Sequence, residues 1–178
     1  MTQPDGKSSG LCPDAILGHA EQLARLPGDV LVPRSVHARR SVSAAYYAVF
    51  HRVSLNLAWA AVPLGPDSAR WELCRATGHS SIATVAGWVN GRGTPPTPVA
   101  GLVELARESA ELHTFALGFV QLKGLREDAD YDHCATFGRD VAIAACRTAR
   151  RATDALEAVY GEPRWATFAT LAILRGTR

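Results

Sequence analysis

The sequence predicts an all-α protein, an up-and-down bundle of about five main helices with a short helix at its C-terminal end. Apolar residues recur at three- and four-residue intervals over long stretches of the chain. Proline and glycine divide these stretches into segments of helical length. No stretch alternates between apolar and polar residues with the β-branched enrichment that is typical of strands. Residues 13–178 are expected to form one domain, because 178 residues are enough for a single core.

The first predicted helix spans residues 13–26, and Pro13 suits its first turn. It is ended by the breaker sequence at 26–29, which contains Pro and Gly. The second predicted helix is long, from 35 to 61, and is ended by Pro63.

A third predicted helix spans 67–88, with an interruption expected near Gly78. The clearest loop of the chain follows at 90–98, where the sequence reads NGRGTPPTP. The fourth predicted helix spans 98–125 and carries Pro98 in its first turn.

A fifth predicted helix spans 136–160, and the last segment, 165–174, is short and almost entirely apolar. Its apolar residues lie at helical spacing, so we expect it to cover the end of the bundle. Docking of a partner protein or of a second subunit is the alternative for this segment. Residues 1–12 are polar and rich in Gly and Ser, which predicts a flexible N-terminus.

The composition is that of a soluble globular protein, with 47% apolar and 20% charged residues. No apolar run of this chain reaches the ~18 residues that a membrane-spanning helix requires. The first ten residues lack the apolar segment of a secretory signal. We therefore expect a cytoplasmic protein that does not act at a membrane.

Net charge and cysteine spacing place only weak limits on what the protein could bind. The formal net charge of +2 neither demands nor excludes a nucleic acid, which would need a local basic patch. The four cysteines include no CxxC pair and are expected to be free thiols. No cluster of His, Cys, Asp and Glu has the spacing of metal ligands, so neither a metal nor another cofactor is expected.

The first unusual segment is RRSVSAAYYAVFH, residues 39–51. On a helix, Tyr47 and His51 share one stripe. Tyr46 and Phe50 share the adjacent stripe. The small residues between them permit close approach of a neighbouring helix, which favours a tightly packed helix crossing. A ligand site that includes His51 is the alternative.

The second unusual segment is LKGLREDADYDH, residues 122–133. Arg126 and His133 are seven residues apart, so a continuous helix would place both on one face, about 10 Å apart along its axis. Asp130 lies between them, one helical turn from each. If the helix ends between residues 128 and 132, the two side chains can instead fold closer together.

Such a pair suits phosphodiester chemistry without a metal. A histidine can take or give a proton at neutral pH. An arginine fork can hold a phosphate and offset the charge that builds on it, while an adjacent 2′-hydroxyl attacks the phosphorus. The alternative for this segment is a solvated acidic helix end with an internal Arg126–Asp130 pair.

Taken together and in this order, the two segments resemble the HEPN superfamily, the higher eukaryote and prokaryote nucleotide-binding domains. Its small prokaryotic members carry a helix with the pattern R-x-x-x-S-x-A-Y-Y-A-x-F-H followed by L-R-x-x-A-D-Y-D, which here are residues 39–51 and 125–132. A long helix follows in both cases, and the similarity covers residues 13–160.

The resemblance implies a helical bundle that forms a homodimer. Many HEPN domains are metal-independent endoribonucleases with an Arg-x4–6-His motif, whose two copies face each other across the dimer interface. Arg126 and His133 satisfy the longest form of this motif. The resemblance then gives His133 the acid/base role and Arg126 the phosphate-holding role, with Asp130, Tyr131 and Glu127 in support. Such a protein would cleave RNA, as a toxin with a cognate antitoxin or as a component of phage defence.

Two alternatives to catalysis remain open at this point. A non-catalytic HEPN dimer would serve as a nucleotide-binding unit, a scaffold or the partner of a nucleotidyltransferase. A purely structural subunit of a larger assembly would dock through residues 165–174.

Other basic and histidine-containing positions are weaker candidates. Arg107 and His113 form a second Arg-x5-His match, for which an exposed Arg107–Glu111 pair is the simpler expectation. Arg75 and His79 could contact phosphate, although a turn after residue 78 explains them equally well.

Arg147, Arg150 and Arg151 form a basic run on the last long helix and are candidate RNA contacts. A solvated face and pairing with the acidic stretch at 127–132 are the two alternatives for this run.

Overall fold

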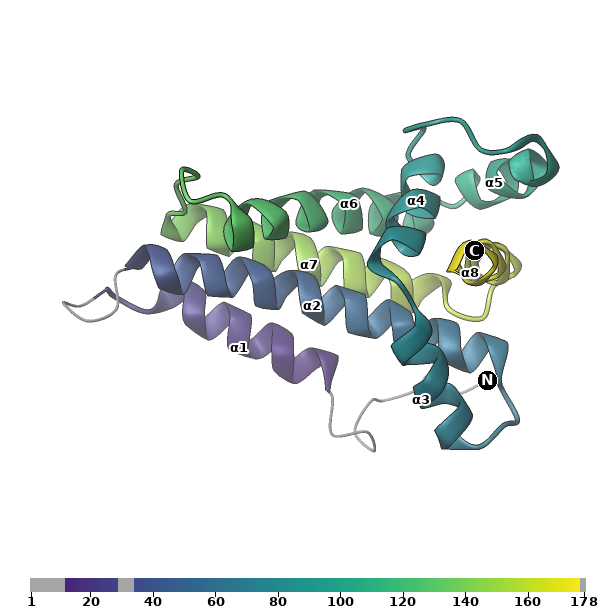
Figure 1. The fold of residues 1–178 in the computed structure, drawn as a ribbon, viewed down its shortest axis with the longest axis horizontal. Helices are drawn as coiled ribbons and strands as arrows, with labels where there is room; N and C mark the ends of the chain where they lie inside the picture. The colour runs from purple at the N-terminus through teal and green to yellow at the C-terminus, as the bar shows by residue number, and fades with distance from the viewer. Residues whose placement is uncertain (1–11, 29–33, 177–178) are drawn as a thin grey trace.

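The all-α prediction is confirmed in the computed structural model, which describes residues 12–28 and 34–176. Within these residues the chain forms eight α-helices, one 3₁₀ turn and no strand (Figure 1). The expected flexible N-terminus, residues 1–12, lies outside the described residues except for its last position. The helices, in chain order, are α1 (Pro13–Arg25), α2 (Arg34–Ala61), α3 (Asp67–Ala76), α4 (His79–Val89), α5 (Ala100–Arg107), α6 (Ala110–Tyr131), α7 (Arg139–Val159) and α8 (Pro163–Gly176), with the 3₁₀ turn η2 (Thr97–Val99) before α5.

Helices α1, α2, α6 and α7 lie along the long axis of the molecule, and α2 packs against the other three. Figure 1 shows that successive members of this set run in opposite directions, as expected for an up-and-down bundle. α3 packs on the C-terminal part of α2, and α4 crosses onto α6. α5 and α8 pack together at one end of the bundle.

Helix α2 is buried nearly all around, which explains its many small side chains. Ala45, Val49 and Val53 have no exposed surface. The hydroxyl of the buried Ser41 donates to the carbonyl oxygen of Ala20 in α1, at 2.8 Å. Small residues let three helices approach α2 at once. The predicted close helix packing of this segment is therefore confirmed.

Two predicted helices are each divided in the structure. The segment expected at 67–88 is α3 and α4, which meet at Gly78 as anticipated. The prediction of a single helix at 98–125 is wrong, because α5 ends at Arg107 and a new helix, α6, begins after Ser109. The Ser109 hydroxyl oxygen accepts the N–H of Leu112 at 3.1 Å and so caps α6.

Helix α6 also continues six residues beyond the predicted end at 125 and closes at Tyr131. The prediction of an Arg107–Glu111 ion pair is wrong as well. Arg107 pairs with Glu104 on its own helix, at 2.5 Å, and donates to the carbonyl oxygen of Trp88. The break after α5 turns Arg107 toward α4 and away from the first turn of α6.

Helix α8 covers the end of the bundle, as expected for the apolar C-terminal segment. Trp165, Phe168 and Leu171 are buried, while Leu174 is exposed. The Phe168 ring packs edge-on against Phe115 of α6, with centroids 5.5 Å apart. The four cysteines are free thiols. None of the helices in the described part of the chain is both long and apolar enough to cross a membrane.

Candidate functional site

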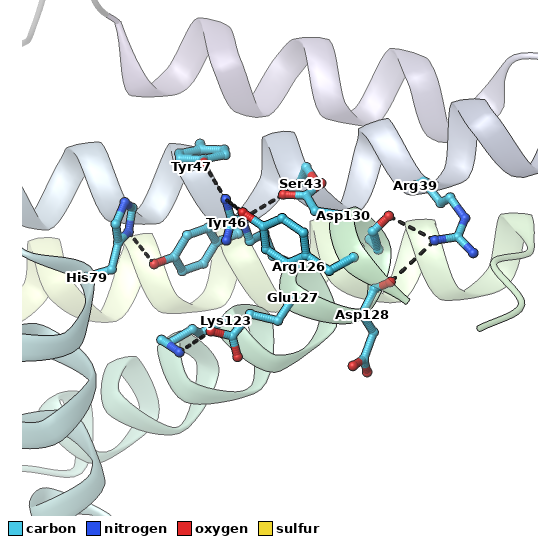
Figure 2. Close-up of polar contacts among 12 residues, drawn as sticks. Arg39, Ser43, Tyr46, Tyr47, His79, Lys123, Arg126, Glu127, Asp128 and Asp130 are labelled. Atoms are coloured by element: carbon cyan, nitrogen blue, oxygen red, sulfur yellow. Dashed lines mark hydrogen bonds and ion pairs between the residues drawn. The ribbon is translucent and has the colours of Figure 1, made fainter. Parts of the chain in front are cut away.

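The two sequence motifs meet in the structure, side by side on α2 and α6 (Figure 2). Arg39, Ser43 and Tyr47 follow one another at four-residue spacing and therefore share one face of α2. Each of these side chains bonds to the last two turns of α6. The motif residues thus form one continuous polar contact between two helices that are far apart in the sequence.

Arg39 caps the C-terminal end of α6. Its Nη1 donates to the carbonyl oxygens of Asp128, Ala129 and Asp132, at 3.3, 2.9 and 2.9 Å. Its Nη2 donates to the carbonyl oxygen of Ala135 at 2.5 Å. The last carbonyls of a helix have no partner within the helix, and a cation there also complements the helix dipole.

Arg126 occupies the middle of the contact. Its Nη2 donates to the Tyr47 hydroxyl at 2.8 Å and, at 3.4 Å, to that of Tyr131. Its Nε lies 2.7 Å from Oδ2 of Asp130, and Oδ1 of the same carboxylate accepts the Ser43 hydroxyl. Burial lowers the pKa of Arg126, but the bond to Tyr47 and the charge of Asp130 outweigh it and raise the pKa above its ordinary value. The guanidinium therefore stays charged.

His79, the first residue of α4, lies on the opposite side of Arg126 from Arg39 (Figure 2). Its Nδ1 is 2.6 Å from the hydroxyl oxygen of the buried Tyr46, and its ring stacks on Phe50 with centroids 3.8 Å apart. Burial lowers the pKa of His79, and the positive charges of Arg126 and Lys123 lower it further. The ring is thus held in one orientation and kept neutral at neutral pH, beside a permanent cation.

His51 belongs to the same aromatic cluster. Its ring stacks on that of Tyr47, with centroids 6.0 Å apart. Burial lowers the pKa of His51, and the neighbouring His79 contributes in the same direction. Next to it, a cavity of about 560 Å³ opens between α2 and α3, with Trp71 and Arg75 on its α3 side. A nucleoside is within the size range of ligands that such cavities take.

The motif pair Arg126 and His133 is not brought into contact. His133 is exposed and follows the end of α6 at Tyr131, so of the two possibilities that the sequence left open the helix end between residues 128 and 132 is the one present. The helix ends because the Asp132 carboxylate accepts the N–H groups of Cys134 and Ala135, at 2.8 and 3.2 Å, which turns the chain. Within the described residues, no hydrogen bond or ion pair joins His133 to Arg126.

The supporting residues divide into two groups. Asp130 and Tyr131 contact Arg126, although the Tyr131 side chain is largely exposed. Glu127 instead pairs with Lys123 one turn earlier on α6. The internal Arg126–Asp130 pair anticipated as the alternative for this segment is present. Arg75 pairs with Glu72 at 2.5 Å.

His79 is the residue whose importance the sequence understated. It belongs to no spacing motif with Arg126, and only the packing of α4 against α6, with the His79 ring against Tyr46 and Phe50 of α2, brings the two together. The described residues contain no group of three or more His, Cys, Asp or Glu placed to hold a metal ion. Comparison with protein-family models, with curated proteins and with solved structures finds no match to this chain.

The lowered pKa of His79 predicts a pH-dependent stability. The unfolded chain binds the proton with the ordinary pKa of about 6.5, so this contribution to stability is fully present above that pH. It is lost as the pH falls from there through the lower pKa of the folded state. Urea unfolding at pH 7.5 and 5.5 should therefore show a smaller difference for His79→Gln than for wild type. An unchanged difference would contradict the assignment, and His113→Gln, an exposed histidine of α6, is the matched control.

Proposed function

We propose that this chain is a metal-independent endoribonuclease of the HEPN type. The observation that carries the proposal is the half-buried imidazole of His79, whose pKa is lowered, in the same side-chain cluster as the guanidinium of Arg126 (Figure 2). Proton transfer to or from a hydroxyl and charge stabilisation at a phosphate are the two requirements of RNA transesterification. Both groups come from rigid helices, which favours a fixed geometry.

In the proposed reaction, Arg126 donates hydrogen bonds to the phosphate. Its Nη1 has no hydrogen-bond partner among the described residues, so one edge of the guanidinium is free for a ligand. A neutral histidine takes the proton of the 2′-hydroxyl, and the 2′-oxygen then attacks the phosphorus. The bond to the 5′-oxygen breaks, and a second acid protonates the leaving oxygen. The products are a 2′,3′-cyclic phosphate and a 5′-hydroxyl.

The two histidines divide these proton transfers between them. His79 is the base, in the tautomer whose Nδ1–H donates to Tyr46 and whose Nε2 carries the lone pair. His133, on the exposed segment after α6, is the acid. The cavity next to His51 accommodates the base of a neighbouring nucleotide. The resemblance to HEPN domains adds a homodimer to the proposal, and a toxin or phage-defence role for the cleavage.

A non-catalytic HEPN dimer is the second candidate, and a specific observation favours it. Arg126 is already bonded to Tyr47, Tyr131 and Asp130, all within the chain. Arg39 and Ser43 extend this contact along the two helices. In this second candidate the motif residues hold α2 against α6, and the domain serves as a nucleotide-binding or scaffold module for a partner protein.

The deciding test is cleavage of total RNA and tRNA by the purified protein in excess EDTA. We expect wild type to leave 2′,3′-cyclic ends. Arg126→Ala, His79→Ala and His133→Ala should each lower the rate about 100-fold, the typical loss for one charge-stabilising or proton-transferring group. His113→Ala, which alters the second Arg-x5-His match, is the matched control and should keep the wild-type rate.

The variants also separate the two candidate functions. Intact RNA after incubation with folded, dimeric wild type would exclude the nuclease and leave the scaffold. Full activity of His133→Ala together with a loss in His79→Ala would remove His133 from the mechanism. Circular dichroism of each variant checks that a loss of rate is not a loss of fold.

A further inference from the structure

A second basic feature lies away from Arg126, where α1 packs on α7. There, four arginine side chains line a concavity of about 240 Å³. We call it the arginine groove, formed by Arg25 of α1 and by Arg139, Arg147 and Arg150 of α7. Ala24, Ile143 and Cys146 supply its apolar wall.

The positive charge of the groove is mostly uncompensated. Glu21 supplies its one carboxylate, which is bound to Arg150 at 2.6 and 3.1 Å. The side chains of Arg25, Arg139 and Arg147 have no hydrogen-bond or ion-pair partner in the part of the chain that the structure describes. Like charges gathered in one concavity repel each other and raise the local affinity for anions.

The chemistry of the groove fits phosphate groups joined in a strand. Guanidinium forks bind phosphate oxygens through two parallel hydrogen bonds. Arg139 and Arg150 are eleven residues apart on one helix, which separates them by about 16 Å along its axis. One phosphate cannot span that distance, whereas consecutive phosphates of an extended strand can. The concavity is also far too small to take up a duplex.

We propose that the arginine groove binds the phosphodiester backbone of single-stranded RNA, independently of its sequence. The proposal does not rest on cleavage at Arg126. Of the basic run predicted to contact RNA, Arg147 and Arg150 line the groove and Arg151 does not. Arg25 and Arg139 are additional RNA contacts in this proposal. Arg25 and Arg139 lie outside the basic run of the sequence and reach it only because α1 packs against α7.

The test measures binding to a fluorescein-labelled 2′-O-methyl oligouridylate of twelve residues, by fluorescence anisotropy over a salt series. This probe lacks the attacking 2′-hydroxyl, so binding is measured whether or not the protein cleaves RNA. The log of the binding constant should fall against the log of the salt concentration with a slope of about −0.7 for each phosphate contact. Arg25→Ala, Arg139→Ala and Arg147→Ala should each weaken binding about fivefold and lower the slope by about 0.7.

Two further variants distinguish the groove from general charge. Glu21→Gln removes the one carboxylate and releases Arg150, so it should bind the probe about threefold more tightly. A damaged fold cannot produce that gain. Arg92→Ala removes an exposed arginine of the loop after α4 and should keep the wild-type affinity. Thermal unfolding of each variant confirms that it is folded.

Several results would overturn the proposal. Failure of the wild-type protein to bind the probe would exclude the proposal. Equal losses of affinity in Arg147→Ala and Arg92→Ala would show that binding depends only on the net charge of the protein. A loss in Arg151→Ala as large as that in Arg147→Ala would move binding to the open face of α7. Tighter calorimetric binding of inorganic triphosphate would reassign the groove to a small polyphosphate, and equal binding of labelled polyglutamate would reassign it to an acidic protein.

Discussion

Arg39→Ala is expected to lower the free energy of unfolding by about 2–4 kcal/mol, an unusually large loss for a side chain that is only half-buried. The guanidinium donates to four carbonyl oxygens around the end of α6 and lies over the Phe137 ring, 4.9 Å from its centroid. Its removal takes a donor away from each of these carbonyls, of which Asp128 alone keeps the N–H of Asp132, and removes the favourable charge at that end of the helix.

Thermal unfolding followed by circular dichroism measures the effect. A chain of this size loses about 2–4 °C in Tm for each kcal/mol. Arg40→Ala is the matched control, because Arg40 is the exposed neighbour of Arg39 and should change stability by less than about 0.5 kcal/mol. Arg39→Lys should recover only part of the loss, since an ammonium cannot reproduce the planar fork. Equal stabilities of the Arg39→Ala and Arg40→Ala variants would show that the cap contributes nothing.

Trp165→Ala should cost about 3–5 kcal/mol, the range for deleting a large aromatic side chain from a core. Trp165 is 2% exposed, and its ring stacks on Phe168 with centroids 5.8 Å apart. The indole is among the largest fully buried side chains of the protein, so its loss opens a cavity between α8 and the rest of the bundle. The docking of α8 is therefore expected to weaken.

Urea unfolding monitored by circular dichroism measures this loss. The indole Nε1–H is buried with no acceptor among the described residues, so Trp165→Phe should retain most of the stability. Leu64→Ala alters a large apolar residue that is 99% exposed and serves as the control. If Trp165→Ala were as stable as Leu64→Ala, α8 would not be part of the cooperative unit.

Helix α6 illustrates what local sequence can and cannot predict. The start after Ser109 carries a capping signal, yet the apolar periodicity runs through it and predicts one longer helix. The far end at Tyr131 depends on Arg39, 92 residues earlier in the chain. Charged residues at a helix end predict solvation unless a partner from elsewhere is known, so the cap that Arg39 provides could not be predicted from the local sequence.

By itself, the sequence determined the all-α class and most helix positions, because a 3.6-residue period and Pro or Gly breaks are local properties. It also named Arg126 and Asp130. Only the tertiary structure decided that His79 lies beside Arg126 while His133 does not, and that Arg25 joins the basic run of α7. Those contacts depend on how helices cross, and the crossing is set by packing among side chains that are distant in the sequence.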